Sequence, residues 1–442
     1  MTRQPLPRID YHGKRALVMG LGVFGGGAGV ARFLAERGAR VTVTDLQPPE
    51  RLEASIQALR GYDIRFVLGE HREQDVLEAD FVVRNPAVPR ASPFLRLAEA
   101  RGIPIYMEMT LFFLECPSRR VIGITGTKGK TTTTTLVGEI LKAAGRDVVV
   151  AGNLRVSALE QLPRISAATD VVLELSSFQL EGLECIRVSP PVSAITNLMA
   201  DHLNRYRSLE EYFAAKKLIY RFQGPDGVVA LNRDNAYCRR LAADAPGRVV
   251  WFGGDDPVPG AERSRLRGEH NRANMAAAAA VARAAGTGDD AIERAIAAFA
   301  GVPYRQELVR EWNGVQFVND TAATTPDATV AALETADRPV VLIAGGADKE
   351  LDFTGLGQAV RATGSKVKAV VLLEGSATDK LAKALGEKVA GRYDHFPAAV
   401  RAAAALAAPG EMVLLSPGCA SFGMFANEFD RGDQFNEIVH AL

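Results

Sequence analysis

The chain is poor in cysteine and lacks long apolar runs. Its 442 residues hold four cysteines (Cys116, Cys185, Cys238, Cys419), none of them in a CxxC pair. This pattern argues against a disulfide framework and against a cysteine-built zinc site. No stretch reaches the roughly 18–20 uncharged apolar residues of a membrane span. The first twenty residues also lack the apolar core of a secretory signal. We therefore expect a cytoplasmic protein.

An excess of charge of either sign is also missing. The 52 basic and 52 acidic side chains give a formal net charge of zero. Proteins that bind nucleic acids or acidic membranes generally show a basic excess, so this balance disfavours both classes. Lysine contributes only 12 of the basic residues. A lysine inside a glycine- or threonine-rich loop therefore suggests that an ammonium group is needed there.

Short β-branched runs alternate with longer segments of helical periodicity, which predicts an α/β fold throughout. The length suits about three domains. Breaks in the pattern place them at residues 1–117, 118–302 and 303–442, and an alanine-rich helix is expected from about Asn274 to Ala285. The expected strands lie in RALVMG, RVTVTD, FVVRNPAVP, RRVIGIT, VVLELSS, VSAITN, GVQFVND, PVVLIAGG, KAVVLLEG and EMVLLSPG.

The strongest local motif is VIGITGTKGKTTTTT, residues 121–135. A strand that runs into glycines and then a helix start is typical of a phosphate-binding loop, in which backbone N–H groups of residues 126–131 face an anion. Lys130 would reach the terminal phosphates and the Thr131 hydroxyl would bind Mg²⁺. The motif is a short GxxGKT form, because Ile124 occupies the first glycine position of the long form. The alternative is a glycine turn without a ligand.

A second glycine motif, GxGxxG, is formed by Gly20, Gly22 and Gly25 after a predicted strand, and Asp45 ends the next strand. Taken alone, this spacing favours a dinucleotide site with Asp45 on a ribose. The alternative is that the glycines only allow close packing of helix and strand.

Two further segments carry charged side chains within or just after predicted strands. Glu174 stands inside a strand predicted to be buried, where Mg²⁺ or an arginine partner would offset its charge. His202 follows a strand end, and Lys216 and Lys217 stand on the next helix. Taken alone, a histidine there is more often a structural or surface residue than a ligand, and such a pair of lysines is usually solvated.

Together these segments resemble the Mur ligases, the ATP-dependent amino-acid-adding enzymes of peptidoglycan precursor synthesis. GTKGKTT and ADHLNRY are similar to motifs of the whole family. ELSSFQLE and LLSPGCASFGMFANEFDRGDQF resemble its D-glutamate-adding branch. GEHNRANMAAA, FVNDTAATTPDAT and AGGADKELDF follow in the family's order, so the resemblance covers nearly the whole chain.

The resemblance implies a Rossmann-like domain for UDP-N-acetylmuramoyl-L-alanine, a central ATPase domain and a C-terminal Rossmann-like domain for glutamate. It reassigns the GxGxxG loop and Asp45 to the UDP-sugar. It implies ATP and Mg²⁺, with Lys130, Glu174, His202 and a carbamylated Lys216 as catalytic residues, the last three and Thr131 being metal ligands. The implied ATP contacts are Gly126, Thr127, Lys128, Gly129, Lys130, Thr131, Thr132, Asn271, Asn274, Arg305 and Asp320. Further substrate contacts are Asn153, Ser176 and Gln179 near the muramoyl group, and Thr324, Lys349, Ser416 and Phe422 around glutamate.

Some positions depart from the family pattern. Arg155 stands where glycine is usual, Ala322 where lysine is usual, and Asn204 where aspartate is usual. These departures leave a non-catalytic nucleotide-binding subunit as one alternative. Another is a folylpolyglutamate-synthetase-like or different amino-acid-adding ligase, against which the segments SSFQLE and SPGCASF argue. A nicotinamide-dependent dehydrogenase would leave GTKGKTT unexplained. We expect small-molecule substrates, no nucleic acid, no membrane insertion and a monomer. The sequence leaves the chirality of the glutamate open.

Overall fold

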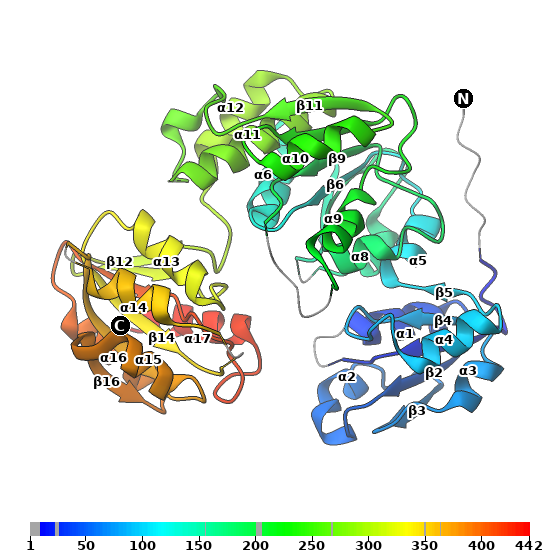
Figure 1. Ribbon diagram of the computed structural model, residues 1–442, viewed down its shortest axis with the longest axis horizontal. Coiled ribbons are helices and arrows are strands. Elements are labelled where there is room, and N and C mark those ends of the chain that lie inside the picture. The colour runs from blue at the N-terminus through cyan, green and yellow to red at the C-terminus, as the bar shows by residue number, and fades with distance from the viewer. Residues whose placement is uncertain are drawn as a thin grey trace. The chain divides into compact units, whose positions relative to one another are not determined.

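The computed structural model describes residues 9–22, 26–154, 156–199, 206–266, 268–348, 351–362 and 364–442. It contains three sheets, one within each of the three predicted ranges (Figure 1). Two compact units contain them: Met1–Ser264 with Glu269–Phe299, and Arg265–Gly268 with Ala300–Leu442. The first unit holds the N-terminal and central sheets. Among the helices described, none combines the length and apolar character that a membrane span requires.

The N-terminal sheet has five parallel strands in the order β3-β2-β1-β4-β5. Alternate residues of β1 pack on opposite faces, Ala16 and Val18 on one and Leu17 and Met19 on the other, so both faces are buried. The strand order reverses between β1 and β4, where open α/β sheets bind ligands at their carboxyl edge. The strands are Arg15–Met19 (β1), Arg40–Asp45 (β2), Ile64–Leu68 (β3), Phe81–Arg84 (β4) and Ile105–Tyr106 (β5); the helices are Gly26–Glu36 (α1), Glu53–Gln57 (α2), Glu73–Glu78 (α3), Pro93–Ala100 (α4) and Glu108–Glu115 (α5).

The central sheet has six parallel strands in the order β11-β10-β9-β6-β8-β7. The chain leaves β6 for one side of the sheet and later returns to its other side, so the crevice at the carboxyl end of β6 is a topological switch point. The strands are Val121–Thr125 (β6), Val148–Gly152 (β7), Asp170–Glu174 (β8), Val192–Ile195 (β9), Val228–Asn232 (β10) and Arg248–Phe252 (β11); the helices are Lys130–Ala143 (α6), Ala158–Gln161 (α7), Ser177–Glu181 (α8), Leu209–Lys217 (α9), Ala236–Leu241 (α10), Glu269–Ala284 (α11) and Asp289–Ala298 (α12).

The C-terminal sheet has six strands in the order β12-β13-β17-β14-β15-β16. Its strands run parallel except β12, which pairs antiparallel with β13. Side chains of α13, α14 and α15 belong to the core on one face, and those of α16 and α17 to the core on the other. The strands are Glu307–Trp312 (β12), Val315–Asn319 (β13), Val340–Gly345 (β14), Val367–Leu373 (β15), Val389–Tyr393 (β16) and Met412–Leu415 (β17); the helices are Pro326–Thr335 (α13), Thr354–Arg361 (α14), Thr378–Leu385 (α15), Phe396–Leu406 (α16) and Glu428–His440 (α17).

The α/β class is confirmed, and each of the ten expected runs contains a strand. One expected boundary is wrong, because the alanine-rich helix begins at Glu269 rather than near Asn274. The hairpin β12–β13 was not predicted. It turns at Asn313 and Gly314, whose φ angles of 51° and 76° suit the left-handed conformation that asparagine and glycine tolerate best.

Candidate active site

The loop between β6 and α6 has a shape that only glycine allows at two positions. Gly126 has φ 153°, and a Cβ atom there would lie 1.9 Å from Thr196 Oγ1. Gly129, the N-cap of α6, has φ 80°, and its Cβ would lie 2.2 Å from Asn274 Oδ1. The loop is therefore fitted tightly against the residues that follow β9 and against α11.

Not every amide of this loop is available to an anion. Thr127 N donates to Asn197 O at 2.9 Å, and Lys128 N donates to Asn197 Oδ1 at 2.9 Å. The expectation that the amides of residues 126–131 all face a ligand is therefore wrong for these two. The N-terminus of α6 remains as the part of the loop that can bind an anion. Helix geometry points its N–H groups outward there and adds a partial positive charge. Lys130 begins this helix, and its Nζ donates to Thr127 O at 2.9 Å.

Glu174 ends β8 directly beside this loop, paired in register with Ile124 of β6 and Gly152 of β7. The residue is only 1% exposed. Its Oε1 accepts a hydrogen bond from Asn153 Nδ2 at 2.9 Å, whereas Oε2 is buried and has no hydrogen-bond partner. In the described part of the chain no arginine forms an ion pair with it. A buried carboxylate oxygen without a hydrogen-bond partner is a suitable ligand for a hard divalent cation.

Lys216 is buried and Lys217 is not. Lys216, 2% exposed, donates from Nζ to Gly126 O at 2.8 Å, and its Nζ lies 4.8 Å from the centre of the Tyr212 ring. Lys217 forms an ion pair with Asp244 nearer the surface. Adjacent residues on a helix are about 100° apart, so only Lys216 is directed at the phosphate loop. The Tyr212 hydroxyl also lies 3.3 Å from Thr127 Oγ1.

The residues described include no group of three histidine, cysteine or acidic side chains placed to hold a metal ion. His202, the expected histidine partner of Glu174, lies outside the described residues, as do Asn204 and Arg155. Thr131, in the first turn of α6, is half-buried, as is Thr132 beside it. Glu174 with its open oxygen is thus the described side chain that fits Mg²⁺ best.

The two asparagines expected at the nucleotide stand together on α11. Asn274 Nδ2 donates to Asn271 Oδ1 at 3.1 Å, as residues three apart on a helix can. Asn274 also lies against Gly129. The structure therefore brings Asn274 to the phosphate loop.

In the N-terminal sheet, Asp45 contacts the glycine loop rather than open space. Its Oδ2 accepts from Gly22 N at 3.0 Å and its Oδ1 from Gln47 N at 2.8 Å. Gly20 and Gly22 have φ angles of 90° and 68°. Asp45 therefore shapes the loop at the carboxyl edge of β1, while Gly25 lies outside the described residues.

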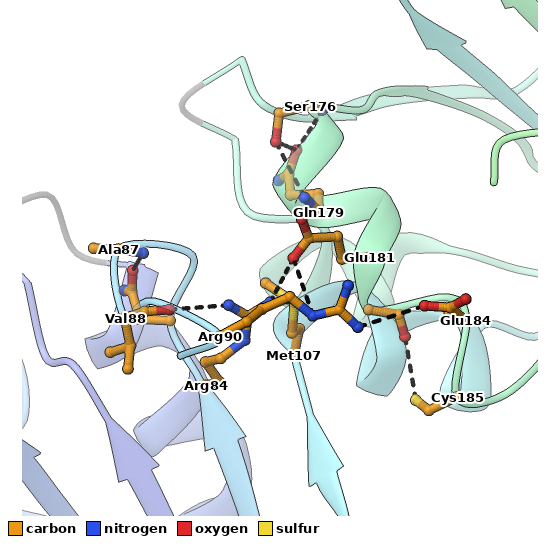
Figure 2. A network of polar contacts seen from close by, with 12 residues as sticks. Arg84, Ala87, Val88, Arg90, Met107, Ser176, Gln179, Glu181, Glu184 and Cys185 are labelled. Carbon is orange, nitrogen blue, oxygen red and sulfur yellow. Dashed lines mark hydrogen bonds and ion pairs between the residues drawn. The ribbon is translucent and has the colours of Figure 1, made fainter. Parts of the chain in front are cut away.

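Of the residues expected at the muramoyl group, one contacts Glu174 and two follow it closely in the chain. Asn153 holds the Glu174 carboxylate, as described above. Ser176 and Gln179 bond to one another: Gln179 N donates to Ser176 Oγ at 3.2 Å and Ser176 N to Gln179 Oε1 at 3.0 Å (Figure 2). This reciprocal capping box starts α8, so both side chains fix the helix next to Glu174.

In the C-terminal unit, Asp320 and Ser416 meet directly. Ser416 Oγ donates to Asp320 Oδ2 at 2.8 Å, and Gln306 N donates to Asp320 Oδ1 at 3.2 Å. Burial raises the pKa of Asp320 to about 7, against the lowering effect of these hydrogen bonds and of Arg305. Asp320, which is expected to contact the nucleotide, thus forms a hydrogen bond with Ser416, which is expected to contact glutamate.

The other residues expected at the glutamate differ in exposure. Thr324 is half-buried, Phe422 is 51% exposed, and Lys349 lies outside the described residues. Sequence reasoning missed Arg431, whose guanidinium is fully buried and donates to Thr321 Oγ1 at 2.9 Å and to Thr321 O at 3.0 Å. Burial lowers the pKa of Arg431 to about 10. Arg431 anchors the segment that leads to Thr324.

Sequence reasoning also missed Thr196 and Asn197, which support the phosphate loop. The signal was present, because both are polar and follow a buried strand at the carboxyl edge of the central sheet. Tyr212 had no such signal, since an aromatic residue on an amphipathic helix is typically part of the core.

Comparison with known protein families gives three matches in the order of the three sheets. Residues 14–107 match the N-terminal domain of MurD-like Mur ligases, residues 124–262 the Mur ligase middle domain, and residues 304–419 the Mur ligase glutamate ligase domain.

Among individual proteins, the chain is similar to the UDP-N-acetylmuramoylalanine–D-glutamate ligases. It is 52% identical to that of Roseiflexus sp. (strain RS-1), over 98% of this chain and 100% of the relative. It is 38% identical to that of Symbiobacterium thermophilum, over 97% and 98%. The fold is similar to that of the UDP-N-acetylmuramate–alanine ligase of Thermotoga maritima, with TM-score 0.62 and 21% identity over 97% of this chain and 100% of that one.

Proposed function

The chain belongs to the Mur ligase family, and we propose that it is the member that adds D-glutamate to UDP-N-acetylmuramoyl-L-alanine. The observation that carries this proposal is the 52% identity to a UDP-N-acetylmuramoylalanine–D-glutamate ligase along the full length of both chains. The chirality of the glutamate, which the sequence motifs left open, follows from the names of these relatives. We place the reaction in the cytoplasm, in peptidoglycan precursor synthesis.

The proposed reaction is ATP-dependent and forms ADP. The γ-phosphoryl group of ATP passes to the terminal carboxylate of the alanyl substrate and gives an acyl phosphate. The amine of glutamate then attacks the acyl carbon, an amide bond forms, and phosphate leaves. Phosphoryl transfer of this kind depends on positioning and charge neutralisation. Lys130 at the start of α6 supplies a cation for the phosphates.

Magnesium, when bound, would neutralise phosphate charge and orient the phosphoryl oxygens. Glu174 supports this assignment because its Oε2 is buried without a partner. Lys216 is proposed to carry a carbamate. A carbamylated nitrogen keeps one N–H for Gly126 O, while its two oxygens become anionic ligands suited to a hard cation. Thr131 and His202 complete the proposed ligands.

The C-terminal unit is proposed to bind glutamate through Thr324, Lys349, Ser416 and Phe422. Lys349 would pair with a glutamate carboxylate through a charge-assisted bond. Ala322 removes the cation that is usual two residues before Thr324.

The test is ADP release by the purified full-length protein with ATP and Mg²⁺. We expect release only when both UDP-N-acetylmuramoyl-L-alanine and D-glutamate are present, with a product whose mass equals their sum less water. L-Glutamate, L-lysine and D-alanine should be poor replacements. Release that needs only one substrate, or preference for a non-acidic amino acid, would refute the proposal.

A further inference from the structure

Arg84, the last residue of β4, is a buried arginine whose guanidinium joins two parts of the first unit. Its side chain is 7% exposed, and that of Glu181, at the end of α8, is 6% exposed. Arg84 Nη2 donates to Glu181 Oε2 at 2.9 Å and Nη1 donates to Val88 O at 2.9 Å (Figure 2). The pair links the N-terminal sheet to the central domain across 97 positions of the chain.

On the side of the N-terminal sheet, Arg84 holds the turn that supports the glycine loop. Its bond to Val88 O closes the turn over residues 85–88. Asn85 in this turn donates from N to Met19 O at 2.9 Å, and a Cβ on Gly20 would lie 2.8 Å from Asn85 Cβ. The turn and the loop expected to hold the uridine diphosphate are therefore in direct contact.

On the side of the central domain, Glu181 holds α8 in place. Its second oxygen, Oε1, accepts from the Tyr206 hydroxyl at 3.0 Å. The Tyr206 ring stacks on Phe178 with centroids 5.6 Å apart and an interplanar angle of 3°. Helix α8 begins at the Ser176–Gln179 capping box, two residues after Glu174. Both carboxylate oxygens of Glu181 therefore fix the segment next to the proposed phosphoryl-transfer site.

We propose that Arg84 and Glu181 are positioning residues that set the spacing between the uridine-diphosphate end and the acyl end of the substrate site. The inference rests on the proposed function, because only a substrate that contacts both ends depends on this spacing. Neither side chain needs to touch the substrate. A substrate that contacts both ends fits only when their spacing matches its own length, so a small displacement of one end weakens binding of the whole molecule and misplaces its reacting group.

The neighbouring arginine offers a contrast. Arg90 is 64% exposed, and its Nε lies 4.0 Å from Glu181 Oε2; both residues line a groove of about 290 Å³. Exposed ion pairs contribute little. Arg90→Met should therefore leave substrate binding unchanged, although it faces the same carboxylate.

The experiment separates positioning from stability with four variants of the full chain: Arg84→Met, the double variant Arg84→Met/Glu181→Gln, Arg90→Met and Arg146→Met. Removing only Arg84 leaves a buried charge without its partner and lowers the melting temperature, whereas removing both charges restores it. The glutamine introduced by Glu181→Gln keeps an amide oxygen for the Tyr206 hydroxyl. Arg146 pairs with Asp170 at 2.5 Å at the opposite end of β8 from Glu174, so its loss tests stability alone.

Binding of UDP-N-acetylmuramoyl-L-alanine and of Mg·ADP is measured separately by titration calorimetry. We expect Kd for the UDP-substrate to rise about ten- to a hundredfold in both Arg84 variants, the order of effect that a displacement of about 1 Å within a binding site can cause. Kd for Mg·ADP should be unchanged in both. Arg146→Met should lower the melting temperature and change neither Kd.

Recovery of substrate affinity together with stability in the double variant would overturn the inference, as would equal weakening of both ligands. Wild-type protein that fails to bind UDP-N-acetylmuramoyl-L-alanine would instead overturn the proposed function, and the inference with it. Wild-type binding with an unaffected double variant overturns the positioning role alone.

Discussion

Replacing Glu174 by glutamine should stabilise the metal-free protein. The carboxylate is 1% exposed and only one of its oxygens has a hydrogen-bond partner. Glutamine has the same shape and keeps the bond from Asn153 Nδ2, but it carries no charge. A buried, unsatisfied neutral group costs about 1–3 kcal/mol and a charged one more. We therefore expect Glu174→Gln to raise the free energy of unfolding by about 1–2 kcal/mol.

The assay is urea denaturation with a chelator, repeated with saturating Mg²⁺ and ADP. A ligand that binds only the folded state at a hundred times its Kd adds about 2.7 kcal/mol. Wild-type protein should gain this stabilisation from the magnesium–nucleotide pair. Glu174→Gln should gain clearly less and should lose ligation, so the order of stability reverses when the ligands are added.

Asp170→Asn is the matched control, because it makes the same chemical change at the other end of β8. Asp170 is paired with Arg146, so this substitution leaves a cation unpaired and should destabilise the protein in both conditions. If Glu174→Gln also destabilises the metal-free protein, the charge of Glu174 is compensated by other groups of the protein. That result would refute the argument that Glu174 is a magnesium ligand because one of its oxygens has no partner.

Other predictions concern cations at the phosphate loop and the buried acid of the C-terminal unit. Lys130→Ala should lower kcat about 10²–10³-fold in the ligation assay, the usual effect of removing a preorganised charge; near wild-type turnover would exclude this loop as the triphosphate site. Lys216→Ala should lose most activity and regain part of it with acetate, whereas Lys217→Ala should remain active; the opposite pattern would assign the carbamate to Lys217. Because burial raises the pKa of Asp320 from an ordinary 3.8 to about 7, the unfolded chain ionises first and stability falls as pH rises from about 4 to 7. Melting curves between pH 5 and 8 should show a shallower decline for Asp320→Asn, and parallel curves would contradict the raised pKa.

Features that depend on neighbouring residues could be predicted from the sequence. The glycines at 126 and 129 next to Lys130 predict a tight strand-to-helix turn, and the turn is found. Lys216 and Lys217 differ by about 100° on a helix, which predicts their different surroundings. The Asn313-Gly314 turn is equally local and typical of a hairpin, so β12 could have been predicted as well.

Contacts between distant segments could not be predicted in this way. Arg84 and Glu181 carry no local signal of their pairing, and each alone resembles a solvated surface residue. Arg431 is similar, since arginine is almost never fully buried without a charged partner. Its hydrogen bonds go to Thr321 and to the Cys419 carbonyl, which lie in other segments of the C-terminal unit. Such positions are known only when the packing is known.

The support that Thr196 and Asn197 give to the phosphate loop has a consequence for how a nucleotide is received. Hydrogen bonds with these two residues hold the amides of Thr127 and Lys128 and the carbonyl of Lys128. A loop already ordered loses little conformational entropy when a ligand arrives. The deuterium uptake of these two amides should therefore be slow in the free protein and change little when ATP binds, while the α6 start becomes newly protected.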